Sequence, residues 1–337
     1  MKRAARIGAL LGLALLVILA VRSDLPGIAR TLESGGWNLL WLVPYRTLFY
    51  ALYAVGWVIL LHPVDPQHRA GFPYVLWATM VRDAVDRLLP VASVGGSVVG
   101  VRLLRWRGLA APPVAASVII EIVLTLIVVY LFIALGLILM VELSAAGFAN
   151  RSTYGRLLVP FLLSLPVPAA TLLMLRYGSV AERLHKLLGP WLGDSVRVED
   201  AAALDAELRA SLRRVRNMTL AGALQLLAFA SGGFEIWFAL RLFGHPVSAP
   251  SALVLESLIQ AVRHLAFVVP GGIGVQEAGF VLFGQALGID ADLALAVSMA
   301  KRMREIACGI PVLISWQWAE GVRLQRQMRF RSGQSRS

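Results

Sequence analysis

Charged side chains inside long apolar runs are the residues of this sequence that could do chemistry. Glu121 interrupts one apolar run, and Lys301 and Arg302 fall near the middle of the last one. An ionisable group inside a bilayer is costly unless it is paired or hydrated, so such groups mark substrate or ion pathways by default. We therefore expect Glu121 to pair with Lys301 or Arg302. The alternative is inert structure, in which Glu305 neutralises Lys301 one helical turn away.

A polar stripe leads to a proline–glycine break in the C-terminal half. Glu256, Gln260 and Arg263 share one helical face because they lie four and three residues apart. Pro270 ends that helix because proline lacks the backbone donor that a helix needs. Glu277 follows the break at the start of the next apolar segment. These residues form the second group of candidates for binding a polar ligand.

The glycines after Pro270 offer a seat for an anion. Gly271, Gly272 and Gly274 can present free backbone N–H groups, and the start of a half-helix adds positive dipole. With Arg263 nearby, the turn suits a phosphate or carboxylate headgroup. A simple tight turn between two half-helices explains the same glycines equally well, and both interpretations stay open.

A matching break in the N-terminal half begins at Pro90. Asp83 and Arg87, and likewise Arg82 and Asp86, are four residues apart, so we expect each pair to neutralise itself on one helix. Arg87 is the expected exception because it stands directly before the break. It is therefore a candidate for contact with a ligand.

The two breaks occupy equal places in the two halves of the chain. An offset of 180 (270 − 90) relates Pro90 to Pro270, Gly108 to Gly288 and Glu121 to Lys301. Each half contains a broken segment, a turn with glycine, a helix start rich in small residues and then an intramembrane charge. We expect an inverted-topology repeat, with halves at about 37–141 and 218–320, which is the architecture of secondary transporters.

Composition requires that a bilayer surrounds these elements. The chain is 58% hydrophobic and 15% charged, with a mean hydropathy of +0.72, whereas soluble domains carry about 25% charged residues. Lipid satisfies no backbone groups, so the apolar runs must be helices. We predict an all-α polytopic integral membrane protein in which two re-entrant hairpins, at 73–107 and 252–290, accompany six crossings. The alternative for each broken segment is two short spans kinked at the proline. The expected crossings are 7–21, 37–61, 114–141, 157–175, 218–243 and 292–320.

The net charge of +12 is explained by topology rather than by nucleic acid. The arginines flank the apolar runs, and cytoplasmic loops of membrane proteins accumulate Lys and Arg. We expect both termini in the cytoplasm of a bacterium, with the chain in its inner membrane. A single transmembrane domain at 1–322 then contains a cytoplasmic amphipathic linker at about 176–216, with leucines spaced as on an interfacial helix. A basic tail follows at 323–337.

The run Pro270-Gly271-Gly272-Ile273-Gly274-Val275-Gln276-Glu277 resembles the Pro-Gly-Gly-(Leu/Ile)-Gly-x-x-Glu motif of a flippase-like family. That family includes the transmembrane region of lysylphosphatidylglycerol synthases. Leu89-Pro90, Arg102, Gly108-Leu109 and Glu121 resemble its first conserved block. The segments 89–96 and 297–302 are similar to the branch associated with hopanoid biosynthesis. The family's usual Pro-Gly-Arg-x-Gly-Glu is replaced here by Pro90-Val91-Ala92-Ser93-Val94-Gly95-Gly96, so the headgroup preference of better-known members does not carry over.

Resemblance and residues together predict translocation of a hopanoid-linked or anionic-headgroup lipid. The alternative is an accessory protein that holds lipid-biosynthesis enzymes without transport of its own. We expect no enzyme activity, because the sequence has no nucleophile elbow, phosphate loop or metal-ligand spacing, and we expect neither cofactor nor metal; its single cysteine is Cys308. The candidate lipid-binding residues are Arg87, Pro90, Glu121, Glu256, Arg263, Pro270, Gly271, Gly272, Gly274, Glu277, Lys301 and Arg302.

Overall fold

The computed structural model describes residues 25–89, 95–145, 159, 161–177, 198–265, 269 and 272–334, and within them it is helical with no strand. The helices in chain order are α2 (Leu25–Gly35), the 3-10 helix η1 (Gly36–Trp41), α3 (Leu42–Leu61), α4 (Phe72–Leu88), α5 (Gly95–Trp106), α6 (Ala111–Ala145), α8 (Pro166–Tyr177), α10 (Val198–Arg213), α11 (Val215–Leu242), α12 (Ala249–Leu265), α13 (Val275–Ala286) and α14 (Ala291–Gln334). The protein is therefore an all-α polytopic membrane protein, as predicted.

Three helical stretches among the described residues are long and apolar enough to cross a membrane. They are Leu32–Leu61, Ala111–Leu143 and Val215–Leu242, and they match three of the predicted crossings. The crossing expected at 157–175 contains a shorter apolar helix, Phe161–Met174. The crossing expected at 292–320 lies inside α14, whose central charges make it less apolar, and the crossing expected at 7–21 lies outside the described residues.

Each predicted broken segment is a pair of short helices joined at the proline–glycine break. Helices α4 and α12 have 17 residues each, and α5 and α13 have 12 each. They are about 26 and 18 Å long at 1.5 Å per residue, which is shorter than a hydrocarbon core of about 30 Å. The N–H of Gly96 donates to Asp86 and the hydroxyl of Tyr74 donates to the carbonyl of Leu103. These contacts make α4 and α5 an antiparallel hairpin.

The two halves place equivalent helices at equivalent positions in the chain. Helix α13 starts 180 residues after α5 (275 − 95), α14 starts 180 after α6 (291 − 111), and α12 starts 177 after α4 (249 − 72). Gly108 and Gly288 precede the long helices with φ of 78° and 76°. Only glycine adopts this left-handed conformation without strain, which explains why both turns contain one.

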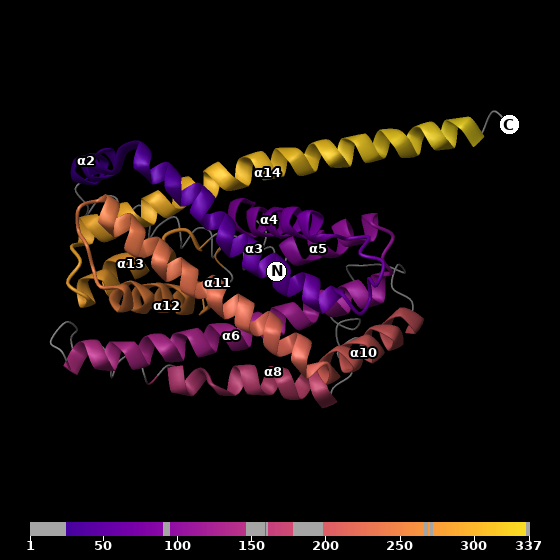
Figure 1. Cartoon of the computed structure of the whole chain (residues 1–337), viewed down its shortest axis with the longest axis horizontal. Helices are drawn as coiled ribbons and strands as arrows, with labels where there is room; N and C mark the ends of the chain where they lie inside the picture. Colours follow the sequence, from indigo (N-terminus) through magenta and orange to yellow (C-terminus); the bar gives the residue numbers. More distant parts are fainter. Residues whose placement is uncertain are drawn as a thin grey trace.

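The halves pack through exchanged contacts. Helix α3 packs on α11, α4 packs on α14, and α6 packs on α12, so the long helix of each half covers the hairpin of the other. In Figure 1, α14 and α6 lie on opposite sides of the bundle, with the two hairpins between them. A Cβ atom on Gly136 of α6 would lie 1.8 Å from the hydroxyl of Ser257 on α12. Small residues allow this close approach, as is common between membrane helices.

The apolar face of α10 covers protein rather than a membrane surface. Leu208 is 1% exposed and belongs to the main hydrophobic core, with Leu204 and Leu212 packed beside it. Helix α10 contacts α6. The prediction that these leucines lie on the membrane interface was therefore wrong, because the sequence period shows an apolar face without showing what covers it.

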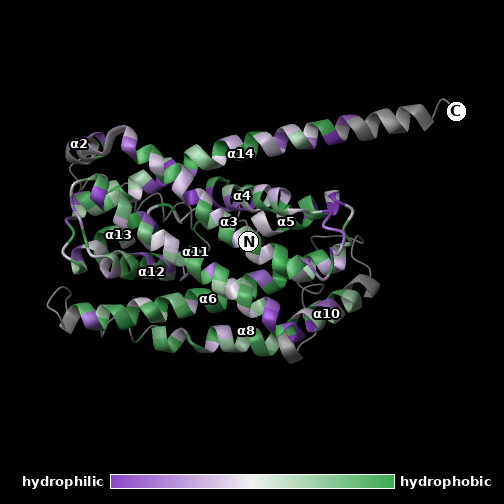
Figure 2. Cartoon of the chain, in the orientation of Figure 1, coloured by the Kyte–Doolittle hydropathy of each residue, from purple (hydrophilic) through white to green (hydrophobic). Residues whose placement is uncertain are grey.

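Figure 2 shows that α6 and α8 are hydrophobic along most of their length, whereas α10 is mainly hydrophilic. Helix α14 has 44 residues, about 66 Å at 1.5 Å per residue, and its C-terminal part projects beyond the bundle (Figure 1). Helix α14 packs against α4, α13 and α3. Lys301, Arg304 and Glu305, in the first third of α14, are each 3% exposed, so these charges are buried in the protein.

Candidate functional site

A cavity of about 500 Å³ lies where the two hairpins meet the crossing helices. It is lined by Phe49, Tyr50 and Tyr53 of α3, Thr79, Arg82, Asp83, Asp86 and Arg87 of α4, Ser97 of α5, Glu121, Ile122, Thr125 and Leu126 of α6, Phe229 of α11, Gln260, Arg263 and His264 of α12, and by Val269 and Gly272 of the second break. Both hairpins thus contribute to one space, which is both charged and apolar.

One side of the cavity contains the ion pair between Arg82 and Glu121. Arg82 Nη1 lies 2.6 Å from Glu121 Oε2, and the Glu121 side chain is 1% exposed. The guanidinium of Arg82 also lies 4.3 Å from the ring centroid of Trp57, where the ring face attracts a cation. The prediction that Glu121 pairs with Lys301 or Arg302 is wrong. Glu121 pairs instead with Arg82 on the neighbouring hairpin.

Lys301 pairs with neither Glu121 nor Glu305, the two partners predicted for it. Its Nζ lies 2.6 Å from Glu256 Oε2, and the two side chains are 3% and 2% exposed. Gln260 donates to the other oxygen of Glu256 at 2.7 Å, so these two residues of the predicted polar face of α12 are in contact, whereas Arg263 contacts Glu305. Each half therefore has an ion pair between its hairpin and its long helix, with the positions of cation and anion exchanged between the halves.

Arg87 connects the first hairpin to α14. Its Nε lies 2.7 Å from Asp83 Oδ1 and its Nη1 lies 2.5 Å from Glu305 Oε1. The predicted pairing of Asp83 with Arg87 is confirmed, and Arg87 also pairs with Glu305 on α14; its contact with a ligand stays a prediction. The predicted pairing of Arg82 with Asp86 is wrong, because Asp86 accepts the N–H of Gly96 at 2.8 Å while Arg82 turns to α6.

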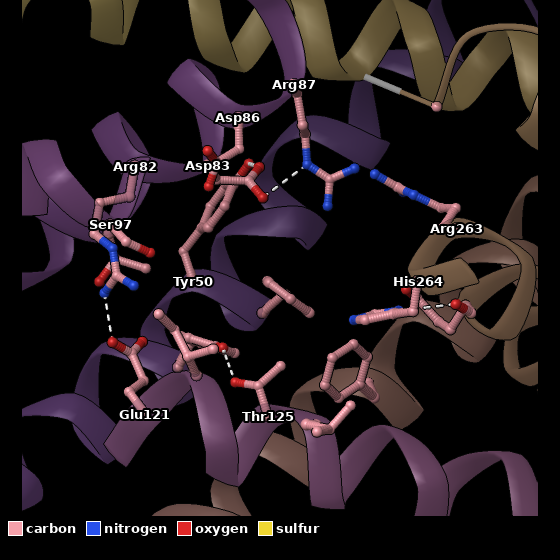
Figure 3. Close-up of a pocket in the computed structure, with 18 of the residues that line it drawn as sticks. Tyr50, Arg82, Asp83, Asp86, Arg87, Ser97, Glu121, Thr125, Arg263 and His264 are labelled. Atoms are coloured by element: carbon pink, nitrogen blue, oxygen red, sulfur yellow. Dashed lines mark hydrogen bonds and ion pairs between the residues drawn. The ribbon is translucent and has the colours of Figure 1, made fainter. Parts of the chain in front are cut away.

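The opposite side of the cavity contains Arg263. Figure 3 shows the guanidinium groups of Arg87 and Arg263 pointing toward one another across this side. Arg263 Nη1 lies 3.7 Å from Glu305 Oε1. Its neighbour His264 contacts the carbonyl of Gln260 through Nδ1 at 2.8 Å. Two cations from different halves thus converge at the cavity.

The motif residues Glu277 and Arg302 lie next to this pair of arginines. Arg302 Nε lies 2.8 Å from Glu277 Oε1, and Arg302 Nη1 lies 3.1 Å from Glu305 Oε2. Glu277 Oε2 also accepts the N–H of Gly274 at 2.7 Å. One carboxylate therefore caps α13 and binds α14, so it fixes the position of the second break relative to the long helix.

The N–H groups of the glycine turn donate to acceptors within the protein. Gly272 and Gly274 have φ of 61° and 78°, and their N–H groups donate to the carbonyl of Val269 at 3.0 Å and to Glu277. These two groups are therefore not free for a headgroup, and the tight-turn interpretation accounts for them. Pro90, Pro270 and Gly271 lie outside the described residues.

A further charged group was not predicted as part of the site. Arg304 Nε lies 2.9 Å from Glu235 Oε1, and Arg46 Nη1 lies 3.9 Å from Glu235 Oε2; all three side chains are almost fully buried. Glu305 and Arg82 were expected only to pair locally and were not among the candidates for the site. Tyr50, whose hydroxyl donates to Asp83 at 2.8 Å, was not predicted at all. Their positions inside apolar helices were the only available signal. Among the described residues, no group of three or more His, Cys, Asp or Glu could hold a metal ion.

Comparison with known proteins gives one match. A family described as the transmembrane region of lysylphosphatidylglycerol synthase matches residues 6–310. No curated protein and no solved structure matches the chain. The family match covers nearly the whole sequence, so the chain belongs to this family and is a membrane protein involved in lipid handling.

Proposed function

We propose that this member of the lysylphosphatidylglycerol synthase transmembrane-region family moves an amphiphilic lipid between the leaflets of the bacterial inner membrane. The observation that carries the proposal is the cavity, whose lining joins charged to apolar side chains and includes residues of both hairpins. Its volume of about 500 Å³ falls within the range of about 300–1,000 Å³ that is common for small-molecule sites. The lipid is one with an anionic headgroup, or one that is hopanoid-linked.

The cavity has the two surfaces that such a lipid needs. Phe49, Ile122, Leu126 and Phe229 supply an apolar side, and Ile122 is 47% exposed. On the polar side, Glu121 Oε1 is buried without a hydrogen-bond partner among the described residues. A buried polar group without a partner costs about 1–3 kcal/mol. A headgroup that carries a hydrogen-bond donor, such as a hydroxyl, would remove that cost, whereas acceptor oxygens alone or a purely apolar ligand would not.

An inverted repeat gives this cavity access to both leaflets. If the halves are inverted, the turns before α6 and α14 face opposite sides of the membrane. The two turns differ in charge: Arg102, Arg105 and Arg107 lie near the first, whereas Asp290 and Asp292 lie near the second. Because cytoplasmic loops are rich in Lys and Arg, the first turn is cytoplasmic and the second is external. Both hairpins are then re-entrant, and both termini are cytoplasmic.

Cysteine labelling tests this topology. Ala110 and Asp290 are equivalent (290 − 110 = 180), and both are exposed. In a Cys308→Ala background, Asp290→Cys should react with a membrane-impermeant maleimide on intact cells stripped of their outer membrane. Ala110→Cys should react only after lysis. Labelling of both cysteines from the same side would refute the inverted repeat.

Lipid movement itself is tested in proteoliposomes that contain fluorescent phosphatidylglycerol, with dithionite to bleach the outer leaflet. Wild-type protein should expose the inner-leaflet probe, and Glu277→Gln and Arg302→Ala should slow this exposure at least tenfold. Arg216→Ala, at an exposed site on α11, is the matched control and should behave as wild type. If the wild type moves no anionic or hopanoid lipid but copurifies with a lipid-biosynthesis enzyme, the accessory role replaces transport.

A further inference from the structure

One buried carboxylate lies at the centre of the charge network. Glu305 is 3% exposed and lies within 4 Å of four arginines. Its distances are 2.5 Å to Arg87, 3.1 Å to Arg302, 3.7 Å to Arg263 and 3.9 Å to Arg304. A single negative charge cannot neutralise four positive ones. The arrangement is stable only if other carboxylates neutralise part of the charge of the four arginines.

Three of the four arginines do have a second carboxylate. The additional pairs are Arg87 with Asp83 at 2.7 Å, Arg302 with Glu277 at 2.8 Å and Arg304 with Glu235 at 2.9 Å. Arg263 differs from them. Among the described residues its carboxylate contact is Glu305 alone, at 3.7 Å, a distance beyond that of a hydrogen bond. Arg263 is thus the cation whose charge is least compensated.

Arg263 also faces the cavity. Arg263 and Arg87 line it, whereas Glu305 does not, so an anion in the cavity would bind the same two guanidinium groups that Glu305 contacts. Figure 3 shows the two groups directed toward each other from α12 and α4. Guanidinium groups bind phosphate and carboxylate through paired N–H donors. The space between them suits an oxyanion with several acceptor oxygens.

We propose that Glu305 is a resident counter-anion that competes with the ligand. An oxyanion of the phosphate class binds between Arg87 and Arg263 and takes over the charge that Glu305 compensates in the unoccupied site. Glu305 thereby sets which anions bind. An anion with one acceptor atom, such as chloride, does not displace it, whereas a phosphate that bridges both arginines does. The assignment of the phosphate to a lipid rests on the proposed function. The competition between Glu305 and the anion does not depend on it.

The same exchange would connect ligand binding to the contact between the halves. Glu305 belongs to α14, whereas Arg87 belongs to the hairpin of the other half. When the ligand replaces Glu305 at Arg87, it weakens the contact by which α14 holds α4. An alternating-access cycle needs a contact of this kind, one that the substrate itself releases.

Binding of inorganic phosphate to the purified full-length protein in a non-ionic detergent tests the competition, measured by calorimetry at constant ionic strength. Glu305→Gln removes the competing charge, so phosphate should bind at least tenfold more tightly than to wild type. Arg263→Gln removes one of the two guanidinium groups that would donate to phosphate, so phosphate should bind at least tenfold more weakly. Glu320→Gln removes a carboxylate from the far part of α14, where it pairs with Arg102, and should leave the phosphate affinity unchanged.

Two further variants keep the test decisive if Glu305→Gln does not fold. Glu305→Asp retains the charge but shortens the side chain, and should give an intermediate gain in phosphate affinity. The double variant Glu305→Gln/Arg263→Gln removes one charge of each sign, and should fold but bind phosphate no better than Arg263→Gln. The proposal fails if folded Glu305→Gln and Glu305→Asp bind phosphate like wild type, or if Arg263→Gln retains wild-type affinity.

Adding a lipid to this binding experiment shows whether the ligand of the site is a lipid headgroup or free phosphate. If a headgroup occupies the same site, doping the micelles with phosphatidylglycerol should raise the apparent Kd for phosphate in wild type, and more strongly in Glu305→Gln. If phosphatidylglycerol has no effect while the variants behave as above, the ligand is a free oxyanion. The competition then stands, and transport of an anionic-headgroup lipid falls. If the proteoliposomes move lipid but Glu305 variants leave phosphate affinity unchanged, transport stands and the competition falls.

Discussion

The ion pair between Lys301 and Glu256 should be strongly coupled, and a double-mutant cycle measures that coupling. The charged atoms are 2.6 Å apart, and both side chains are at least 97% buried. At an effective dielectric constant near 20, their Coulomb attraction is about 6 kcal/mol. Much of this offsets the cost of removing both charges from water. Removing one partner leaves the other charge buried and unpaired, which costs about 3–5 kcal/mol.

The two single variants should therefore be much less stable than the double variant. We expect Lys301→Met and Glu256→Gln each to lose about 3–5 kcal/mol, because each leaves an uncompensated charge in the core. The double variant leaves no charge, and Gln260 can still donate to the amide oxygen at position 256. Replacing a buried pair by neutral groups is often close to neutral. The coupling energy should thus exceed about 3 kcal/mol, against a few tenths for independent sites.

Thermal unfolding in one detergent, followed by tryptophan fluorescence, measures these differences. For a chain of this size 1 kcal/mol corresponds to about 2 °C, so each single variant should melt about 6–10 °C below wild type. The double variant should melt within a few degrees of it. Arg216→Met, which removes a cation from an exposed site, should melt like wild type. Additive losses in the double variant would refute the reasoning, because they would mean that neither charge depends on the other.

Two further predictions concern packing and the second ion pair. Gly136→Ala places a methyl group 1.8 Å from the hydroxyl and 2.6 Å from the Cβ of Ser257, so it should destabilise by about 1–3 kcal/mol in the same melting assay. Gly321→Ala meets nothing within 4 Å and should be neutral or stabilising by up to about 1 kcal/mol. Arg82→Gln should destabilise by about 3–5 kcal/mol by leaving Glu121 unpaired, and adding Glu121→Gln should restore the melting temperature; no restoration would contradict the pairing.

Local chemistry in the sequence was enough to place the helices of both hairpins. Proline removes a helix donor and glycine permits a positive φ, so the breaks at Pro90 and Pro270 and the turns at Gly108 and Gly288 could be identified from residue type alone. The offset of 180 residues then predicted equivalent helices, and the starts of α5 and α13 have that offset. Boundaries of this kind depend on neighbours within one or two helical turns.

Which charges pair was harder to predict. Arg82 lies four residues from Asp86, and spacing alone favours that pair, yet Arg82 binds Glu121 on another helix. Lys301 lies four residues from Glu305 but binds Glu256. In both cases a buried partner across a helix contact prevails over a local one. The distance between two helices is set by small residues such as Gly136 and by the packing of the whole bundle.

The sequence by itself therefore determined that a lipid bilayer surrounds the protein, where the helices lie, and that charges inside the bilayer must be compensated. Each of these follows from the composition or the order of nearby residues. Only the tertiary structure decided that Arg87 and Arg263, from different halves, face one cavity, and that Glu305 connects them. The physical reason is that Coulomb energy depends on distance in space and on burial. Neither quantity is fixed until the two hairpins pack against the long helix of the other half.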